Sequence, residues 1–221
     1  MEAYLGISTD KLLTAGAETI YMVCISLFIG AIIAFPLAIL LYLTRKNGMY
    51  QNRFVNGLLN IIINVIRSTP FIIMLVCVMP LTKVRVGTRI GTKAALVPLT
   101  IYIAPYLARL MEGALLETKA GIIEAAEAMG ATPLQIVWHF ILPESLGSLI
   151  LTITTGTIGL IGATAMAGYI GGGGIGNIAL TYGYQQFNNR LMFFTVLILI
   201  IVVQLIQNLG TWASAKIRRA R

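Results

Sequence analysis

The chain has 221 residues, of which 57% are hydrophobic and only 11% are charged. Soluble domains carry about 25% charged residues, so this composition excludes an ordinary soluble fold and indicates a membrane protein. Sixteen basic and eight acidic residues give a net charge of +8. The basic residues stand in short clusters beside apolar runs, which fits membrane topology and contact with the lipid bilayer, and argues against a nucleic-acid partner.

Five apolar segments are predicted to cross the membrane as helices, because a helix needs about 20 residues to do so. The third segment is expected to continue as a helix through residues 112–116. The sequence therefore predicts an all-α, polytopic integral membrane protein with five transmembrane helices. In chain order the segments cover residues 19–43, roughly 54–81, about 94–111, 146–170 and 191–212.

The start of the chain predicts no cleavable signal peptide. The first seventeen residues contain Glu2, Asp10 and Lys11, and the apolar run that follows is too long for a signal core. We therefore expect residues 1–18 to form an extracytoplasmic segment, followed by a membrane domain over residues 19–213.

Charge at the ends of the spans predicts their orientation. An odd number of spans places the termini on opposite sides, and the basic tail over residues 214–221 is expected in the cytoplasm. The cluster of Arg45, Lys46 and Arg53 then also faces the cytoplasm. The loop over residues 82–93 disagrees with this orientation, because its four basic residues would then lie outside the cell.

The fourth span differs from the others in side-chain size. Fourteen of the 25 residues in 146–170 are Gly, Ala, Ser or Thr, whereas the fifth span is bulky and branched. Small residues let helix backbones approach closely within lipid. The fourth span is therefore expected to face other helices and to leave room for a pathway, while the fifth faces lipid.

Residues 118–143 interrupt the apolar sequence with acidic, glycine and proline residues. Residues 122–129 predict about two helical turns, and Gly130 is suited to a left-handed C-terminal cap. Spacings of three and four place the apolar residues of this helix on one side. These residues are Ile122, Ile123, Ala126 and Met129.

A second short helix is predicted directly after Gly130. Thr132 is suited to the N-cap, Pro133 to the first helical position, and Gln135 to the third position after the cap. The helix is expected to reach Leu142 and to end or kink near Pro143. The whole segment is too short and polar to span, so we expect it to project into the cytoplasm as an elbow.

This segment resembles the EAA loop of bacterial ABC importer permeases. That motif has Glu-Ala-Ala, three residues, glycine, nine residues, an apolar residue, one further residue and Leu-Pro. The apolar residue is usually isoleucine in the family, so phenylalanine here is a conservative departure that bears on local packing. The matching positions are Glu124, Ala125, Ala126, Gly130, Phe140, Leu142 and Pro143.

The resemblance extends over nearly the whole chain. Residues 67–70, Arg-Ser-Thr-Pro, resemble an Arg-x-x-Pro element of these permeases. Residues 104–117, 128–137 and 166–188 are similar to the methionine-importer branch in particular. The likeness implies the type I ABC importer permease fold and an inner-membrane location, and it implies no cofactor or metal.

The resemblance also implies the partners. In this family a separate cytoplasmic ATPase dimer hydrolyses ATP, and each ATPase binds one EAA segment in a groove. One segment per chain then implies a permease homodimer, and an extracytoplasmic binding protein delivers the substrate. The chain itself is not expected to be an enzyme, because the glycine-rich residues 171–177 lack the lysine and Ser/Thr of a phosphate-binding loop.

Four further residues need separate interpretation. Arg67 is a charge inside an apolar run, which suggests function; it could instead reach cytoplasmic headgroups or cap a helix break before Pro70. Met166 could contribute to a gate, by resemblance, or simply pack. His139, the only histidine, is expected at the membrane interface, and Glu124 is expected to dock on the ATPase rather than to act in acid–base catalysis.

Three other functions are possible from the sequence. The chain could serve an importer of another amino acid or small solute. An ion-coupled secondary transporter is disfavoured because the five spans contain no Asp or Glu. A membrane enzyme is disfavoured because no His, Cys or carboxylate cluster has the spacing of a metal or nucleophile site; Cys24 and Cys77 both lie in apolar runs.

Overall fold

Helices form the regular structure of residues 6–219, the part of the chain that this computed structural model describes. Four helical paths are long and apolar enough to cross a membrane, and a bent pair of helices supplies a fifth. No strand occurs in this range. The long helices are α2 (Thr9–Thr44), α3 (Arg53–Ser68), α4 (Phe71–Val86), α5 (Thr92–Leu116), α8 (Leu142–Ala167) and α10 (Asn189–Arg219).

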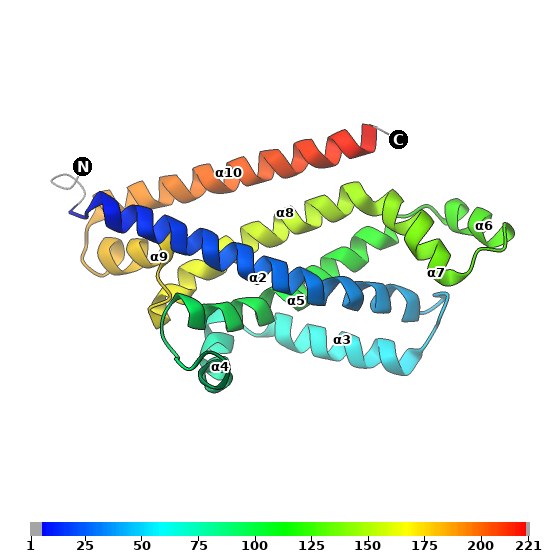
Figure 1. Ribbon diagram of the computed structural model, residues 1–221, viewed down its shortest axis with the longest axis horizontal. Coiled ribbons are helices and arrows are strands. Elements are labelled where there is room, and N and C mark those ends of the chain that lie inside the picture. Colours follow the sequence, from blue (N-terminus) through cyan, green and yellow to red (C-terminus); the bar gives the residue numbers. More distant parts are fainter. Residues whose placement is uncertain (1–5, 220–221) are drawn as a thin grey trace.

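The shorter helices join the long ones at the two ends of the molecule. Figure 1 shows the start of α2 and α9 (Gly174–Asn177) at one end, which we call the N-terminal end. The last turn of α10, the α2–α3 turn, α6 (Ala120–Ala128) and α7 (Pro133–Ile136) lie at the other end, which we call the C-terminal end. Five passes between the ends explain why the start of α2 and the end of α10 lie far apart. A π-helical segment, Ile178–Tyr184, follows α9 and leads towards α10.

Two spans are longer than the sequence predicts. α2 begins at Thr9, where the side chain of Ser8 caps the helix by accepting a hydrogen bond from the Lys11 amide. α10 continues through Arg219, so most of the predicted basic tail is helical. Residues 1–5, 220 and 221 lie outside the described part. The predicted extension of the third span is confirmed, since α5 ends at Leu116.

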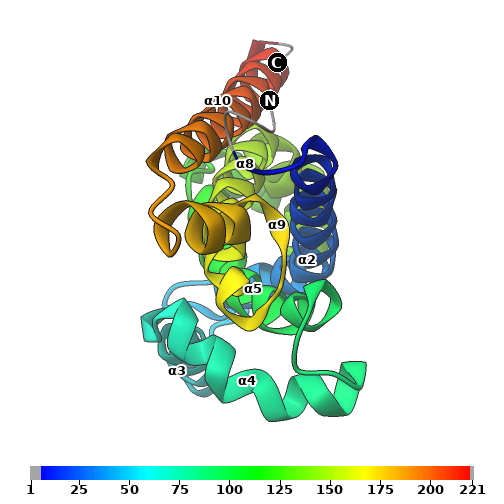
Figure 2. The ribbon, with the colours of Figure 1, turned by 90° about the vertical axis from the view of Figure 1, so that its left-hand side faces the viewer.

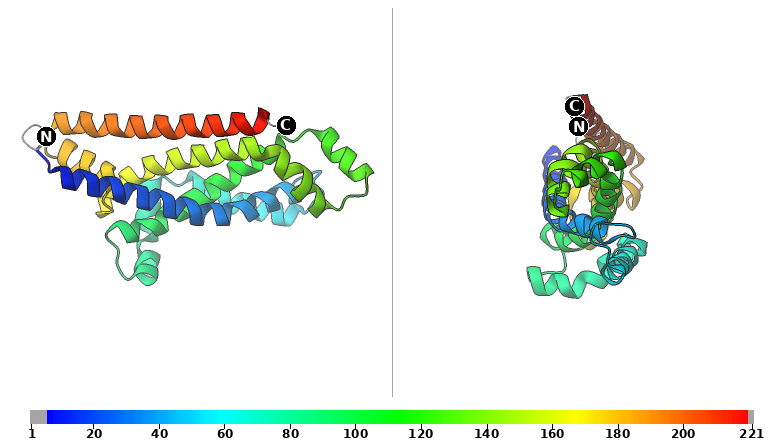
Figure 3. Two further views of the ribbon diagram at one scale, coloured as in Figure 1. Left: turned by 45° about the horizontal axis from the view of Figure 1, so that its top comes forward. Right: turned by 90° about the vertical axis from the view of Figure 1, so that its right-hand side faces the viewer.

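The second apolar run is not one straight span. α3 ends at Ser68, and α4 begins at Phe71 at an angle of 109°. Pro70 has no N–H, and its ring disfavours helical geometry in the preceding residue; Thr69 is extended, with φ −81° and ψ 122°. α4 therefore projects sideways from the bundle (Figure 3), and it includes Thr82–Val86 of the predicted basic loop.

The core lies where α5 packs against α2 and α8. The end view in Figure 2 shows α2 on one side of α5 and α8, and α10 on another. Buried side chains of this core include Leu41, Leu99, Ile103, Leu107 and Leu160. α10 instead exposes large apolar residues such as Phe193 and Leu209, which agrees with the prediction that the fifth span faces lipid.

The glycine-rich run is held by α2 rather than forming one open loop. Gly174 starts α9, and its amide donates a hydrogen bond to the Glu18 carboxylate at 2.7 Å. The Ile175 amide donates to Thr19 Oγ1 at 2.9 Å. Gly173 and Gly174 have φ of +74° and +86°, angles that a side chain would strain. The fourth span is thereby joined to the first at the N-terminal end.

Candidate functional site

The segment between α5 and α8 forms the predicted elbow. α6 ends at Ala128, and Gly130 has the left-handed φ of +76° that the sequence predicts. Its amide donates to the Glu127 carbonyl at 2.9 Å, and the Ala131 amide donates to the Ala126 carbonyl at 3.1 Å. A Cβ at position 130 would meet no atom within 4 Å. Backbone conformation, not crowding, therefore explains the glycine.

The second arm of the elbow starts with the predicted capping box. The Thr132 side chain accepts a hydrogen bond from the Gln135 amide at 3.4 Å. The Gln135 side-chain oxygen accepts one from the Thr132 amide at 2.9 Å. Pro133 takes the first helical position, where an N–H is not needed. Local hydrogen bonds thus define both sides of the elbow.

The second arm does not end at Pro143 but bends near it, the second of the two outcomes that the sequence predicts. A π-helical turn, Val137–Ile141, carries the chain from α7 directly into α8. The Leu142 amide donates to the carbonyl of Val137, five residues back. This wider turn shifts the hydrogen-bond register just before Pro143, which lies at the start of α8. Figure 1 shows α7 leaning away from the α8 axis, so the elbow and the fourth span are one bent helical path.

The tip of the elbow is exposed and partly apolar. It projects past the ends of α2 and α10 (Figure 3). Met129 is 68% exposed and Leu134 is 59% exposed. Ala126 is fully buried and belongs to the main core. The elbow therefore has an inner side fixed to the bundle and an outer side without a partner in the described chain.

The six predicted coupling residues divide between these two sides. Glu124, Ala125 and Gly130 are exposed, Pro143 is partly buried, and Ala126 and Leu142 are buried. The motif therefore describes both a surface and its attachment. His139 is exposed, with Nδ1 3.2 Å from the Gln135 carbonyl, and it follows the half-exposed Trp138 in the chain.

α8 has an open face as well as a packed one. Met166 is 45% exposed near the N-terminal end of the bundle. A Cβ at Gly162 would meet no atom within 4 Å, and one at Gly159 would lie 3.9 Å from Cε1 of Tyr106 on α5. A Cβ at Gly156, by contrast, would collide with the side chain of Leu107. We call the surface along Thr155, Gly159, Gly162 and Met166 the open face of α8.

Arg67 lies in the last turn of α3, directly before the bend. It is exposed, and its guanidinium lies 5.9 Å from the ring centroid of Tyr106. Arg53 begins α3 and Arg45 precedes it, so both are at the end of α3 opposite to Arg67. The helix does break before Pro70, but the Arg67 side chain forms no hydrogen bond to the backbone at this break within residues 6–219. Arg67 and Met166 are thus on different helices, both near the open face of α8.

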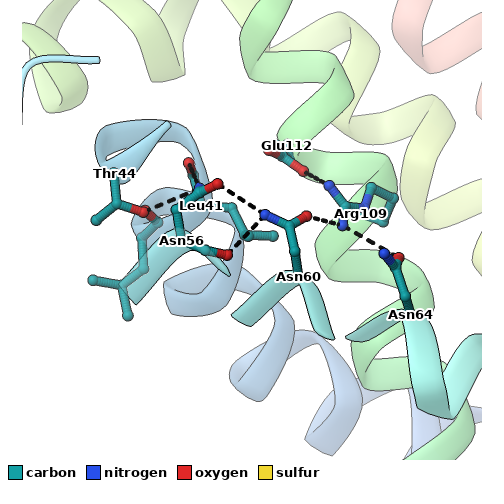
Figure 4. A network of polar contacts seen from close by, with 8 residues as sticks. Leu41, Thr44, Asn56, Asn60, Asn64, Arg109 and Glu112 are labelled. Atoms are coloured by element: carbon teal, nitrogen blue, oxygen red, sulfur yellow. Dashed lines mark hydrogen bonds and ion pairs between the residues drawn. The ribbon is translucent and has the colours of Figure 1, made fainter. Parts of the chain in front are cut away.

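A polar network that the sequence analysis missed joins three spans (Figure 4). Arg109 on α5 forms an ion pair with Glu112 at 2.6 Å and donates to Asn60 Oδ1 on α3 at 2.5 Å. Asn60 donates to Asn56 Oδ1 at 2.9 Å, and Asn56 donates to the Leu41 carbonyl of α2 at 3.2 Å. The repeat of Asn56, Asn60 and Asn64 at every fourth position was the available signal.

A second polar connection joins the end of α5 to α8 and α10. Ser148 donates a hydrogen bond to the Glu117 carboxylate and accepts one from Arg218 at 2.9 Å. A cavity of about 370 Å³ lies beside it, bordered also by Arg109 and Thr155. The end of α5, which leads into the elbow, is therefore bonded directly to α3 and α8, and through Asn56 and Ser148 these networks continue to α2 and α10. No group of three or more potential metal ligands occurs in residues 6–219.

Known proteins are similar to this chain in sequence and in architecture. Residues 30–219 match the family described as binding-protein-dependent transport system inner membrane component. A probable D-methionine transport system permease protein of Vibrio cholerae is 44% identical over 216 residues, covering 98% of this chain and 95% of the relative. A methionine import system permease protein of Bacillus subtilis is 43% identical, covering 92% of each chain.

Solved structures agree with the sequence relatives. The MetNI methionine ABC transporter in an inward-facing conformation contains a chain with a TM-score of 0.91 and 43% identity, covering 96% of this chain and 99% of that one. An amino acid ABC transporter with histidines has a TM-score of 0.78 at 17% identity, a likeness of fold alone. The architecture is that of type I ABC importer permeases, and the chain belongs to the family of inner-membrane components of binding-protein-dependent transport systems.

Proposed function

We propose that this chain is the membrane-spanning permease of an ATP-driven methionine importer. The observation that carries the proposal is the elbow, a capped and exposed projection that continues directly into the fourth span. The names of three similar proteins support methionine as the substrate. The relatives from Vibrio cholerae and Bacillus subtilis and the MetNI transporter are all named for methionine or D-methionine. The chain supplies the pathway, and it hydrolyses no ATP itself.

The elbow couples the chain to a cytoplasmic ATPase dimer. The exposed motif residues Glu124, Ala125 and Gly130 face the ATPase groove together with the apolar tip at Met129 and Leu134. Ala126, Leu142 and Pro143 transmit the movement because they attach the elbow to the bundle. Two grooves require two permease chains, so a homodimer with twofold symmetry forms the pathway.

The charge distribution supports one orientation in the cell membrane. The elbow, the α2–α3 turn with Arg45 and Lys46, and the basic end of α10 all lie at the C-terminal end of the molecule. This end faces the cytoplasm, following the positive-inside rule. The N-terminus then lies outside, where a substrate-binding protein delivers the amino acid.

The open face of α8 lines the pathway in this proposal. It offers small residues, no side chain of residues 6–219 packs against Gly162, and Met166 lies near its outer end. Met166 serves as a gate residue where the two protomers approach each other. We expect Met166→Ala to assemble normally and to raise leakage of methionine without ATP; unchanged leakage and transport would assign Met166 to packing.

Reconstitution tests the proposal. Liposomes containing the permease, its ATPase and its binding protein should take up labelled methionine only with ATP, and in preference to other amino acids. Gly130→Asp should remain inserted in the membrane but lose most ATP-dependent uptake, because a side chain strains the left-handed elbow. Normal uptake by this variant would refute the coupling role of the elbow.

The same experiment separates the other functions. Preferred uptake of another solute would keep the importer but change its substrate. Uptake by the permease alone, driven by a proton or sodium gradient, would establish a secondary transporter instead. A labelled elbow that reacts from the outside of intact cells would overturn the proposed orientation.

A further inference from the structure

Two arginines lie within the apolar spans, and their surroundings differ. Arg109 is satisfied: one side of its guanidinium pairs with Glu112 at 2.6 Å, and the other donates to Asn60 at 2.5 Å and to Asn64 at 3.5 Å. Its side chain is 26% exposed. A guanidinium with this many partners joins helices, and it has little capacity left for a ligand.

Arg67 has no comparable partners. Its guanidinium lies over the ring of Tyr106 and interacts electrostatically with Tyr102, and neither a hydrogen bond nor an ion pair reaches it within residues 6–219. The sequence from residue 19 to residue 111 contains no Asp or Glu at all. Charged groups in membrane segments normally pair with other charges or line a pathway. Arg67 therefore lacks an anion that the local sequence could provide.

The depth of Arg67 argues against simple contact with headgroups at the cytoplasmic surface. Arg67 is fourteen residues after Arg53, which is about 21 Å along α3 at 1.5 Å per residue. The extended Thr69 and the 109° bend then turn the chain sideways immediately beyond it. The bend keeps the arginine at this level of the bundle, over α5.

An aromatic surface lies next to the guanidinium. Tyr102 and Tyr106 are one turn apart on α5, with ring centroids 6.1 Å apart and planes at 12°. Phe71 meets Tyr102 edge-on at 5.3 Å. The two tyrosine hydroxyls make no hydrogen bond within the described residues. The surface thus combines one unpaired cation, ring faces and two free hydroxyl groups.

This cluster borders the open face of α8. The ring of Tyr106 lies beside Gly159, and Gly162 is open beyond it. Met166 follows seven residues after Gly159, or about 10 Å further out along the helix. A solute that has passed Met166 along the open face would next meet Tyr106 and Arg67.

We propose that Arg67, Tyr102 and Tyr106 form a transit site for an α-amino acid on the cytoplasmic side of Met166. The guanidinium binds the carboxylate, for which its planar pair of N–H groups is suited. The tyrosine rings contact the side chain, and a thioether sulfur interacts favourably with aromatic rings. This inference rests on the proposed function, because it assumes that the open face lines the pathway.

The test for the arginine uses the reconstituted importer with its ATPase and binding protein. Arg67→Gln should lower methionine uptake roughly 10- to 100-fold in a fully assembled complex, which is the value of a hydrogen bond to a charged group. Arg67→Lys should be intermediate, because it keeps the charge but loses the planar pair of donors. Arg85→Gln, an exposed arginine on α4, is the matched control and should transport normally.

The test for the aromatic surface compares methionine with norleucine, in which a methylene replaces the sulfur. Because the same binding protein is used with wild type and variant, a change in the uptake ratio between them belongs to the permease. Tyr106→Leu should lower the methionine-to-norleucine ratio roughly 2- to 10-fold, the range expected for a sulfur–aromatic contact. Tyr106→Phe keeps the ring and should leave the ratio unchanged.

The outcomes distinguish the two proposals. If the wild-type complex imports no methionine, the proposed function fails. If it does import methionine, but Arg67→Gln or Arg67→Lys is as active as wild type, only the transit site is overturned. Equal losses in Arg67→Gln and Arg85→Gln would assign Arg67 to phospholipid headgroups, and an unchanged ratio in Tyr106→Leu would remove the aromatic contact.

Discussion

Glycine has different roles on two surfaces of the bundle. One surface is the packed side, where α2 meets α5, and the other is the open face of α8. On the packed side a Cβ at Gly30 would overlap the Ile103 side chain, so this glycine allows two helices to touch. On the open face a Cβ at Gly162 would meet nothing within 4 Å. Small residues in a membrane helix can therefore indicate either close packing or empty space. The neighbouring helix decides which.

The two intramembrane arginines show the same contrast. Arg109 is tied into a network that reaches from α5 through α3 to α2, whereas Arg67 faces the open surface with an aromatic ring as its neighbour. The first arrangement stabilises the bundle. The second leaves a charge available, which is costly in an apolar environment unless a ligand uses it.

The largest effect is expected when the packed side loses its arginine. Arg109→Ala should destabilise the protein by about 3–5 kcal/mol, because Glu112 would remain buried without its partner. Thermal unfolding in detergent measures the change. Replacing both residues by leucine should recover much of the loss, since no buried charge remains; a double variant as unstable as Arg109→Ala would contradict this explanation.

A smaller loss is expected when the helix contact itself is widened. Gly30→Val should lower stability by roughly 1–3 kcal/mol, because the new side chain forces α2 away from Ile103 on α5. Gly16→Val is the matched control, since Gly16 lies on the same helix with no atom near its Cβ position. Similar melting temperatures for the two variants would show that the α2–α5 contact can widen without a loss of stability.

The elbow could be predicted from the sequence because its interactions are local. Gly130, Thr132 and Gln135 act on backbone groups within five residues, and all three have the predicted roles. The π-helical turn before Pro143 could not be predicted, since no sequence signal distinguishes it from ordinary helix. Composition likewise predicted five spans, but it did not predict the 109° bend at Pro70, because the two arms of the bend together are apolar enough to form one span.

The contacts that organise the site are distant in sequence, and for that reason the sequence analysis missed them. Arg109 and Asn60 are 49 residues apart, and Glu18 and Gly174 are 156 residues apart. A single sequence shows each residue type but not which helix lies opposite. Arg67 could be singled out by its charge, yet its position beside Tyr106 became clear only from the fold.

The smallest effect on stability, and the clearest test of the comparison, is expected at the open face. Gly162→Ala should leave the melting temperature unchanged or slightly higher, because the methyl group enters open space and alanine favours a helix by up to about 1 kcal/mol. Uptake should nevertheless fall if this face lines the pathway, since the methyl group narrows it. Unfolding and transport are therefore measured on the same preparation. A variant that is both stable and fully active would show that the space beside Gly162 is not used by the solute, and the open face would then be a surface for lipid.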